Sequence, residues 1–295
     1  MERIIPTDVR VLLEGESGTG KERIARIIHY NGPRQNAPFV AVDCGALPAS
    51  LLESELFGYV KGAFTGAEKD RKGLFEEANT GTLFLDEIAN MPSEIQAKFL
   101  RAIQEGEIRP VGSSQVVKVN VRIIAAVSGD LKAKVDKGEF REDLFYRLNV
   151  VNFPLPPLRE RKEDIAMLAH HFLKQMNEKY DKKIKGFKPN TIAALESYPW
   201  PGNIRELEHA IERAVVLGES DRLSQKDFPF LESPAVVNNE LFKPRYLQDA
   251  LNEFKREYIS QILQQTGGNQ KQAAEILNIQ RTYLNRLIKE LEIKQ

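Results

Sequence analysis

A glycine-rich segment near the N-terminus limits the possible folds of this chain more than any other feature. Residues 15–21 read Gly-Glu-Ser-Gly-Thr-Gly-Lys and lie between an apolar run at 9–13 and a segment with helical spacing. In such a loop, backbone N–H groups at a helix N-terminus surround nucleotide phosphates, and the lysine places its charge beside the β and γ oxygens. A strand, this loop and a helix in succession predict an α/β nucleotide-binding fold; the alternative is a glycine-rich turn with an incidental lysine. The predicted nucleotide-binding residues are Gly15, Glu16, Ser17, Gly18, Thr19, Gly20, Lys21 and Glu22.

The first half of the chain alternates between short β-rich runs and helix-sized segments. The runs lie at residues 9–13, 39–43, 82–85, 121–126 and 150–155. Because these runs are largely apolar on both faces, they predict a parallel sheet covered by helices, in a domain of residues 1–157. Two helices are expected to begin at capping boxes, Ser50 with Glu53 and Ser93 with Gln96.

The remainder of the chain predicts helices only. Residues 158–231 show no strand pattern, and their apolar residues fall at helical spacing, which predicts a small helical domain. Residues 232–244 have the proline and asparagine composition of a linker. Residues 245–295 are expected to form a separate all-α module, with helices near 245–265, 269–277 and 280–290.

The charge balance gives no global attraction to nucleic acid or membranes. Lys and Arg total 42, and so do Asp and Glu, so any DNA binding must come from a local surface. The single cysteine, Cys44, excludes an internal disulfide and fits a reducing compartment. The sequence has no apolar stretch long enough to span a bilayer and no cleavable signal pattern. We therefore expect a cytoplasmic protein without a membrane partner.

An acidic pair follows one of the predicted strands. Asp86 and Glu87 come directly after the apolar run that begins at Thr82, and ligands of open α/β sheets bind at the carboxyl ends of strands. We expect Asp86 to hold Mg²⁺ through water, and Glu87 to orient and deprotonate the water that attacks ATP. The alternative is a solvated strand end, which is disfavoured because the phosphate-binding loop needs an acidic partner.

A hexapeptide between these two motifs indicates what the nucleotide chemistry acts on. Gly62 and Gly66 allow positive φ angles, which would place Phe64 and Thr65 at the tip of a mobile loop; taken alone, the hexapeptide would also fit a surface turn. Together with the preceding Glu-Leu-Phe-Gly-Tyr-Val-Lys, it resembles the loop by which bacterial enhancer-binding proteins of the AAA+ class engage sigma-54. The residues that the resemblance assigns to sigma-54 contact are Gly62, Ala63, Phe64, Thr65, Gly66 and Ala67.

Residues 140–148 match the family segment that carries the arginine fingers. The resemblance implies that Arg141 and Arg147 stabilise charge on a transferring phosphoryl group in a neighbouring subunit. Without it, both would be interpreted as members of surface ion pairs, since Glu142 and Asp143 are adjacent. A finger that acts in a neighbour implies obligatory assembly.

Residues 198–207 are similar to the family's helical-lid signature. The resemblance implies that Trp200 packs beneath a turn and that Arg205 reaches the γ-phosphate from the lid. Asn203 is expected to cap the following helix, with Glu206 completing the box. Tryptophan and proline alone would indicate only a packed corner.

The chain departs from the family pattern at three places. Asp43 stands where the family has an asparagine that holds the catalytic glutamate, so a carboxylate is expected to change this switch. Ser128 follows Val127 where relatives carry Thr-Asn, so Ser128 must supply the polar contact of the first sensor. Only residues 1–8 precede the first strand, which predicts weak nucleotide affinity. Glu22, by contrast, replaces the usual Ser or Thr of phosphate-binding loops in the same way as the family does.

The last fifty residues resemble a Fis-type helix-turn-helix, with 269–279 as the first helix and turn and 280–287 as the recognition segment. The predicted DNA-binding residues are Lys271, Gln280, Arg281, Tyr283, Asn285 and Arg286. The net charge of residues 245–295 is only +2, from eight basic and six acidic residues, so strong binding requires a dimer. The alternatives are a structural or protein-binding three-helix module, and for Asn269 merely a helix cap with Gln272.

These features together predict an ATP-dependent transcription activator. It would bind enhancer DNA as dimers, assemble into a hexamer or heptamer ring, and convert the closed complex of sigma-54 RNA polymerase holoenzyme to the open complex. Control is expected from a separate partner, from expression level or from sequence outside this chain. Two alternatives stay open: a DNA-binding repressor with a vestigial ATPase, and an AAA+ remodeller of a different target.

Overall fold

The computed structural model describes residues 1–232 and 269–291, together with residues 252, 255–256, 258–260, 262–263 and 266. These residues form two compact units, Met1–Phe228 and Pro229–Gln295. No helix among the described residues is long and apolar enough to cross a membrane.

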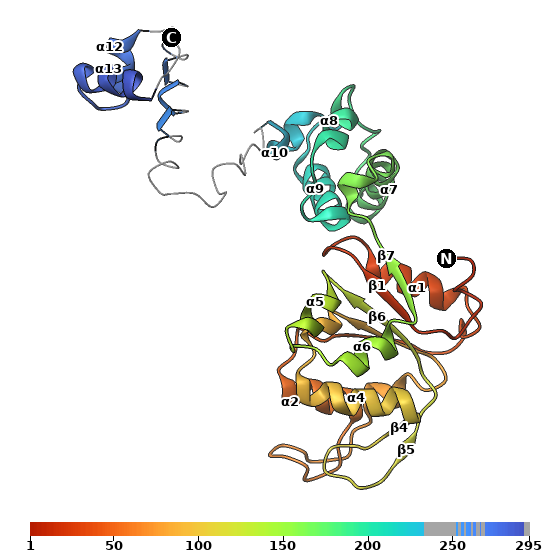
Figure 1. Ribbon diagram of the computed structural model, residues 1–295. Helices are drawn as coiled ribbons and strands as arrows, with labels where there is room; N and C mark the ends of the chain where they lie inside the picture. Colours follow the sequence, from red (N-terminus) through yellow and green to blue (C-terminus); the bar gives the residue numbers. More distant parts are fainter. Residues whose placement is uncertain are drawn as a thin grey trace. The chain divides into compact units, whose positions relative to one another are not determined.

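The first unit is built on a five-stranded sheet with the strand order β2-β3-β6-β1-β7 (Figure 1). Every neighbouring pair in this sheet is parallel, as the sequence predicted. The strands are β1 Val11–Glu14, β2 Phe39–Asp43, β3 Thr82–Asp86, β6 Arg122–Val127 and β7 Val151–Pro154. A short antiparallel pair, β4 Glu107–Ile108 and β5 Val117–Lys118, was not predicted, because two-residue strands leave no periodic pattern.

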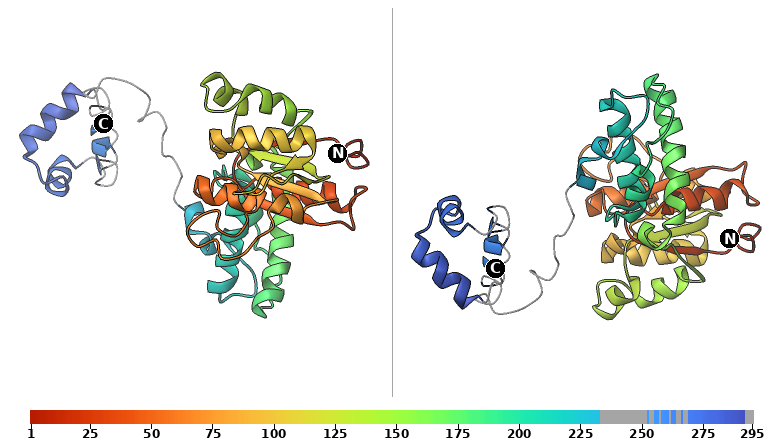
Figure 2. Two further views of the ribbon diagram at one scale, coloured as in Figure 1. Left: turned by 90° about the horizontal axis from the view of Figure 1, so that it is seen from below. Right: turned by 90° about the horizontal axis from the view of Figure 1, so that it is seen from above.

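Alternate residues of the strands face two separate cores. Leu83 and Leu85 pack into the core formed with α2 to α6, whereas Phe84 between them packs into the core formed with α1. Figures 1 and 2 show α4 lying along the sheet. The helices of this part are α1 Lys21–Tyr30, α2 Ala49–Phe57, α3 Leu74–Glu77, α4 Ser93–Glu105, α5 Leu131–Asp136 and α6 Glu142–Leu148.

A helical subdomain follows the sheet within the same unit. We call residues 155–162, which leave β7 and include the short helix η2 Leu158–Glu160, the hinge, and residues 163–228 the lid. Trp200 is fully buried in the lid, and its Nε1 donates to the backbone oxygen of Leu195 at 2.7 Å, as expected for a residue beneath a turn. The lid helices are α7 Glu163–Tyr180, α8 Thr191–Ser197, α9 Asn203–Leu217 and η3 Gln225–Asp227; α10 Pro229–Glu232 comes next.

Three of the predicted helix caps are wrong. Pro48 occupies the cap position of α2, and Pro92 that of α4, so Ser50 and Ser93 lie inside these helices and make no capping bond. Proline is favourable near a helix start, and the prolines set the starts at Ala49, one residue before Ser50, and at Ser93 itself. Asn203 is the first residue of α9, and its side chain bonds to other segments in place of its own helix.

The described residues of the second unit include the helices α12 Gln270–Ile276 and α13 Arg281–Glu290. Asn269 caps α12, because its side chain accepts hydrogen bonds from the backbone N–H groups of Lys271 and Gln272. Leu284 and Leu287 of α13 are buried against α12. The predicted helix at 245–265 falls mostly outside the described residues.

Candidate nucleotide site and target loop

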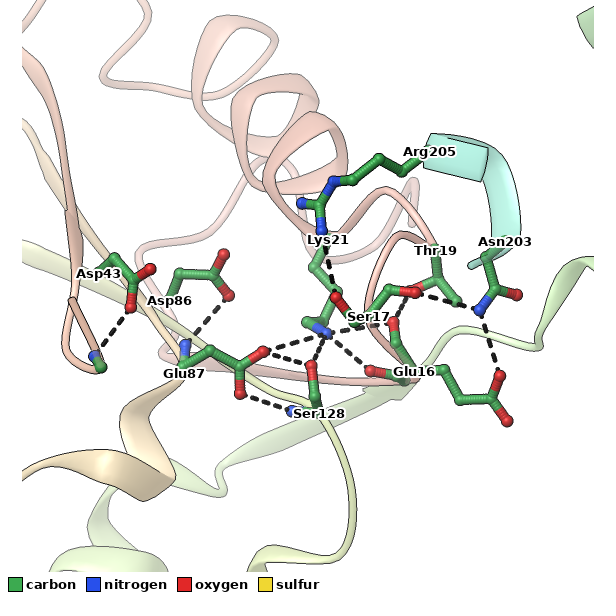
Figure 3. A network of polar contacts seen from close by, with 12 residues as sticks. Glu16, Ser17, Thr19, Lys21, Asp43, Asp86, Glu87, Ser128, Asn203 and Arg205 are labelled. Carbon is green, nitrogen blue, oxygen red and sulfur yellow. Dashed lines mark hydrogen bonds and ion pairs between the residues drawn. The ribbon is translucent and has the colours of Figure 1, made fainter. Parts of the chain in front are cut away.

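The carboxyl ends of β2 and β3, the N-terminus of α1 and the first turns of α9 surround a cavity of about 380 Å³. We call residues 15–21, which follow β1 and end at the first residue of α1, the phosphate-binding loop. Figure 3 shows their side chains beside the acidic strand end and the lid arginine. The predicted site residues that line this cavity are Ser17, Gly18, Gly20, Lys21, Glu22, Asp43, Asp86, Glu87 and Arg205.

Lys21, the last residue of the phosphate-binding loop, is held by hydrogen bonds to the start of that loop and to Ser128. Its Nζ donates to the backbone oxygens of Gly15 at 2.7 Å and Glu16 at 3.3 Å, and to Ser128 Oγ at 2.6 Å. Glu87 Oε1 lies 3.9 Å from the same nitrogen. Burial lowers the pKa of Lys21, and the nearby carboxylates of Glu87 and Asp86 oppose this. A cation therefore stands at the mouth of the loop, where phosphate oxygens would bind.

The acidic pair ends β3. Asp86 Oδ1 accepts a hydrogen bond from the backbone N–H of Glu87 at 3.0 Å, and burial raises the pKa of Asp86. Glu87 adopts a left-handed backbone, with φ of +50°, which turns the chain sharply at the strand end. Such a conformation is uncommon for a residue other than glycine and is often found at functional sites.

Ser128, at the end of β6, holds the Glu87 carboxylate. The backbone N–H of Ser128 donates to Glu87 Oε2 at 3.2 Å, and the Ser128 hydroxyl donates to Oε1 in a short hydrogen bond. Since Lys21 also donates to this hydroxyl, Ser128 joins the two predicted catalytic groups.

Asp43 lies on the neighbouring strand but does not hold Glu87. It is the register partner of Asp86, and its Oδ1 accepts a hydrogen bond from the backbone N–H of Gly45 at 2.8 Å. In the described part of the chain it forms no hydrogen bond with Glu87. Figure 3 shows its carboxylate bonded to its own turn.

Two other loop residues make local contacts. Glu22 accepts hydrogen bonds from Arg26, one turn later in α1, at 2.7 and 2.9 Å. Thr19 is buried, and its hydroxyl donates to the backbone oxygen of Glu16 at 2.8 Å. The Thr19 bond fixes the shape of the loop before α1, whereas the bonds between Glu22 and Arg26 lie within α1.

The lid contacts the phosphate-binding loop directly. Arg205 NH1 donates to Ser17 Oγ at 3.1 Å, and the backbone N–H of Ile204 donates to the oxygen of Gly18 at 3.0 Å. A Cβ placed on Gly18 would lie 2.4 Å from the backbone oxygen of Gly202. Only glycine permits this approach of the two backbones.

Sequence reasoning missed two residues of this contact. Arg159 of the hinge donates to both oxygens of Glu16, at 2.8 and 2.6 Å, and Asn203 of the lid donates to Glu16 Oε2 at 3.1 Å. The bonds from Arg159 and then Asn203 lower the pKa of Glu16 to about 2. Neither partner could be foreseen from spacing, because each lies far from Glu16 in the sequence.

The two predicted fingers lie at the cap and in the last turn of α6, and neither lines this cavity. Arg141 immediately precedes α6 and donates to both oxygens of Asp143, at 3.0 and 2.7 Å. Its backbone N–H donates to Gln96 Oε1 at 2.8 Å. Arg147 is exposed in the last turn of α6, and no described residue forms an ion pair with it.

Residues 62–67, which we call the target loop, connect α2 and α3 at the end of the unit seen below α4 in Figure 1. Gly62 and Gly66 have φ angles of +82° and +101°, as expected. Backbone hydrogen bonds close the loop, from Gly62 N to Ala67 O at 2.9 Å and from Ala67 N to Phe64 O at 3.1 Å. Thr65 is exposed, and Phe64 is 44% exposed.

The base of the target loop is well anchored. Tyr59 and Arg71 exchange two backbone hydrogen bonds of 2.9 Å, and the ring of Phe64 lies edge-on against that of Tyr59, with centroids 4.9 Å apart. The loop between β4 and β5 supports the other side, where Val60 N donates to Val111 O at 3.1 Å. A Cβ on Gly112 would lie 2.8 Å from that of Ala63.

The predicted DNA-binding residues lie along α12 and α13. Most of their side chains are exposed, whereas Asn285 is half-buried. The Arg286 guanidinium lies over the Tyr283 ring, 4.9 Å from its centroid, and Arg286 Nε is 3.5 Å from Glu290. The exposed residues of this set are Lys271, Gln280, Arg281, Tyr283 and Arg286.

Comparison with known proteins accounts for each part of the chain. Residues 1–154 match the family of the sigma-54 interaction domain, residues 159–235 the AAA+ ATPase lid domain, and residues 247–291 the Fis family of bacterial regulatory proteins. The chain is 48% identical to the regulatory protein AtoC of Escherichia coli K12 over 287 residues, or 96% of this chain and 62% of AtoC. It is 49% identical to the transcriptional regulatory protein ZraR of the same organism over 281 residues, or 95% of this chain and 63% of ZraR.

The chain is also similar to solved structures over almost its whole length. NtrX from Brucella abortus in complex with ATP matches with a TM-score of 0.73 and 37% identity, over 98% of this chain and 65% of that chain. The chain thus spans about three-fifths of the length of the curated relatives it matches. The sheet carries a phosphate-binding loop, the lid is bonded to that loop, and glycines flank the target loop. The chain therefore belongs to the family of AAA+ proteins with a sigma-54 interaction domain.

Proposed function

We propose that this chain hydrolyses ATP in the cavity between the phosphate-binding loop and the lid. Lys21 contacts the β and γ phosphate oxygens, and Glu87 accepts a proton from the attacking water. Arg205, which lines the same cavity, reaches the γ-phosphate. The arrangement of Lys21, Asp86, Glu87 and Arg205 around one cavity supports this proposal.

The residues fit a Mg²⁺ ion that arrives with ATP. Asp86 lines the cavity, and only its Oδ1 is bonded to the backbone N–H of Glu87, so its carboxylate would hold a water of the ion. Mg²⁺ usually keeps several waters and takes one or two carboxylates plus phosphate oxygens.

Ser128 takes the switch role that the family assigns to an asparagine at position 43. It bonds both oxygens of Glu87, whereas Asp43 bonds only its own turn. Glu87 must leave Ser128 to reach the water, so the strength of this contact sets when hydrolysis begins.

The fingers act between subunits. Arg147 is exposed on α6 and outside the cavity of its own chain, so its partner is the γ-phosphate in a neighbouring subunit of a hexamer or heptamer ring. Arg141 helps from the start of the same helix. DNA binding by Lys271, Gln280, Arg281, Tyr283, Asn285 and Arg286 brings dimers to enhancer sites and raises the local concentration for ring assembly.

The target loop contacts sigma-54 in RNA polymerase holoenzyme and couples ATP hydrolysis to its remodelling. One observation carries this proposal: Phe64 and Thr65 are exposed on a loop that is anchored only at its base. Exposure of a phenylalanine at such a tip is typical of a partner contact. Movement of the lid and the loop together converts the closed complex to the open complex.

Thr65→Ala tests this proposal. The variant lacks part of the tip and no group of the cavity, so we expect ATP hydrolysis within about twofold of the parent, with no sigma-54 binding and no open-complex formation. Thr7→Ala, at another exposed threonine, is the matched control and should behave as the parent. Normal activation by Thr65→Ala would exclude the target loop from the contact. A parent that hydrolyses ATP without binding sigma-54 would indicate a different target, and one that binds DNA without hydrolysis would indicate a repressor.

A further inference from the structure

Asn203 joins the lid to the phosphate-binding loop through a buried side chain. The residue is 0% exposed, and its backbone has a φ of +54° at the start of α9. Asparagine is one of the few residues that tolerate this left-handed conformation. Because burial of an unpaired amide costs free energy, the partners of this side chain decide its role.

Both polar atoms of the Asn203 side-chain amide form hydrogen bonds with other segments of the chain. Its Oδ1 accepts a hydrogen bond from the backbone N–H of Leu158 in the hinge, at 2.8 Å. Its Nδ2 donates to Glu16 Oε2 and to the backbone oxygen of Ser17, both at 3.1 Å (Figure 3). One side chain at the start of the lid helix α9 therefore contacts both the hinge and the phosphate-binding loop.

Glu16 forms the other half of this contact. Its carboxylate accepts two hydrogen bonds from Arg159 of the hinge. Its backbone oxygen accepts from Thr19 Oγ1 at 2.8 Å and from Lys21 Nζ at 3.3 Å. The side chain of Glu16 thus faces the hinge and lid, and its backbone faces the nucleotide site. A two-pronged pair at an exposed position fixes orientation more than it adds stability.

We propose that Asn203 and Glu16 form a polar joint that transmits movement of the phosphate-binding loop to the lid. Asn203 acts as a positioning residue for Arg205, which follows it by two residues and donates to Ser17 Oγ. When the loop shifts as it takes up phosphates, Ser17 O and the Glu16 carboxylate draw Asn203 with them. The start of α9 and Arg205 follow. This inference rests on the proposed function, because it takes residues 15–21 as the ATP site.

Two variants separate the parts of the joint. Asn203→Gly keeps the left-handed backbone, since glycine adopts it freely, and removes the amide. Asn203→Asp keeps an oxygen for Leu158 N–H but places a carboxylate against Glu16 and Ser17 O. Asn177→Asp is the matched control, because the Asn177 amide bonds only the N–H and oxygen of Ile184 inside the lid.

Amide hydrogen exchange on the full chain tests the joint. Without nucleotide, exchange at Leu158 should rise about tenfold or more in Asn203→Gly, as expected for loss of a buried acceptor, and stay near the parent rate in Asn203→Asp. With a saturating non-hydrolysable ATP analogue, the parent should show slower exchange both in residues 15–21 and in the first turn of α9. Asn203→Asp should keep the first response and lose the second, whereas Asn177→Asp should keep both.

An α9 response in Asn203→Asp equal to that of the parent, or unchanged Leu158 exchange in Asn203→Gly, would overturn the joint. Turnover at saturating ATP should fall in Asn203→Asp, and Arg159→Lys should lose less of it than Arg159→Ala. Failure of the proposed function has a different signature: both segments of the parent respond to the analogue, but ATP is not hydrolysed. That result would support the joint and remove the ATPase.

Discussion

The phosphate-binding loop and the target loop both depend on glycine, for opposite reasons. A Cβ at Gly18 would lie 2.4 Å from the oxygen of Gly202, so a second backbone already occupies the space. At Gly62 and Gly66 a Cβ would meet nothing within 4 Å, and glycine is needed there only for its positive φ. The first loop is bonded to the lid, the hinge and Ser128, whereas the second is bonded mainly to itself and at its base.

Because of this difference, substitutions in the two loops should impair different properties of the protein. Changes in the phosphate-binding loop disturb a network that spans the sheet and the lid, so they should affect binding, hydrolysis and stability together. Changes at the tip of the target loop should affect only the partner. The variants below test that separation.

The largest effect is expected inside the nucleotide network. Lys21→Ala should abolish nucleotide binding, because the only lysine at the loop is lost, whereas Glu87→Gln should bind ATP and lose about a hundredfold to ten-thousandfold in hydrolysis. Filter binding and steady-state turnover measure the two defects separately. Phe64→Ala in the target loop is the control and should show neither. Hydrolysis by Glu87→Gln at the parental rate would remove Glu87 from the role of base.

The next comparison uses the same substitution in each loop. Gly18→Ala combines a left-handed φ with a clash against Gly202, so we expect a loss of about 2–4 kcal/mol in the free energy of unfolding, together with weaker ATP binding. Gly62→Ala has only the φ penalty, about 1 kcal/mol, and should hydrolyse ATP normally. Chemical denaturation followed by circular dichroism gives both values. Equal losses would show that the surroundings of the two glycines do not matter.

Several features of these loops were predictable from the sequence, because they depend on local chemistry. The run 39–43 coincides with β2, and the positive φ angles of Gly62 and Gly66 are those that the hexapeptide predicted. Each follows from residue type and short-range spacing alone.

Other features depend on contacts between distant residues and were missed or wrong. Asn203 has the spacing of a helix cap, but it is buried against Glu16 and Leu158 and bonds to them. Arg159 carries no local signal that it pairs with the phosphate-binding loop. The bonds of Ser128 to Glu87, and of Asp43 to the N–H of Gly45 in its own turn, were not foreseen, because they depend on how the strand ends meet.

A third test concerns the close approach between Gly112 and the target loop at Ala63. Gly112→Ala would bring a methyl group to within 2.8 Å of the Ala63 side chain, so the target loop must move. We expect weaker sigma-54 binding by about tenfold, because the tip is displaced by a contact of this size, with unchanged ATP hydrolysis. Gly138→Ala has a similar φ of +75° and no close atom, and should bind sigma-54 normally. A matching loss in Gly138→Ala would assign the effect to backbone strain elsewhere.

The smallest effect is one of stability. Burial raises the folded-state pKa of Asp86 above its unfolded value, so the native state disfavours the ionised form. Stability therefore falls as pH rises from the unfolded pKa through the folded pKa, and the penalty persists at neutral pH. Asp86→Asn should raise the melting temperature at pH 7 by a few degrees and lose this advantage in acid, while ATP hydrolysis is lost. A lower melting temperature across the whole pH range would contradict this sign.

The closed base of the target loop has a consequence for exchange between proteins. Tyr59 and Arg71 pair through two backbone hydrogen bonds, and neither bond depends on the side chains between them. Residues 60–70 therefore form a segment whose ends are fixed by main-chain geometry, while Gly62, Gly66 and the contact of Ala63 with Gly112 limit its contents. Grafting this segment onto another sheet-and-lid motor with the same base spacing should transfer the choice of partner without redesign of the motor.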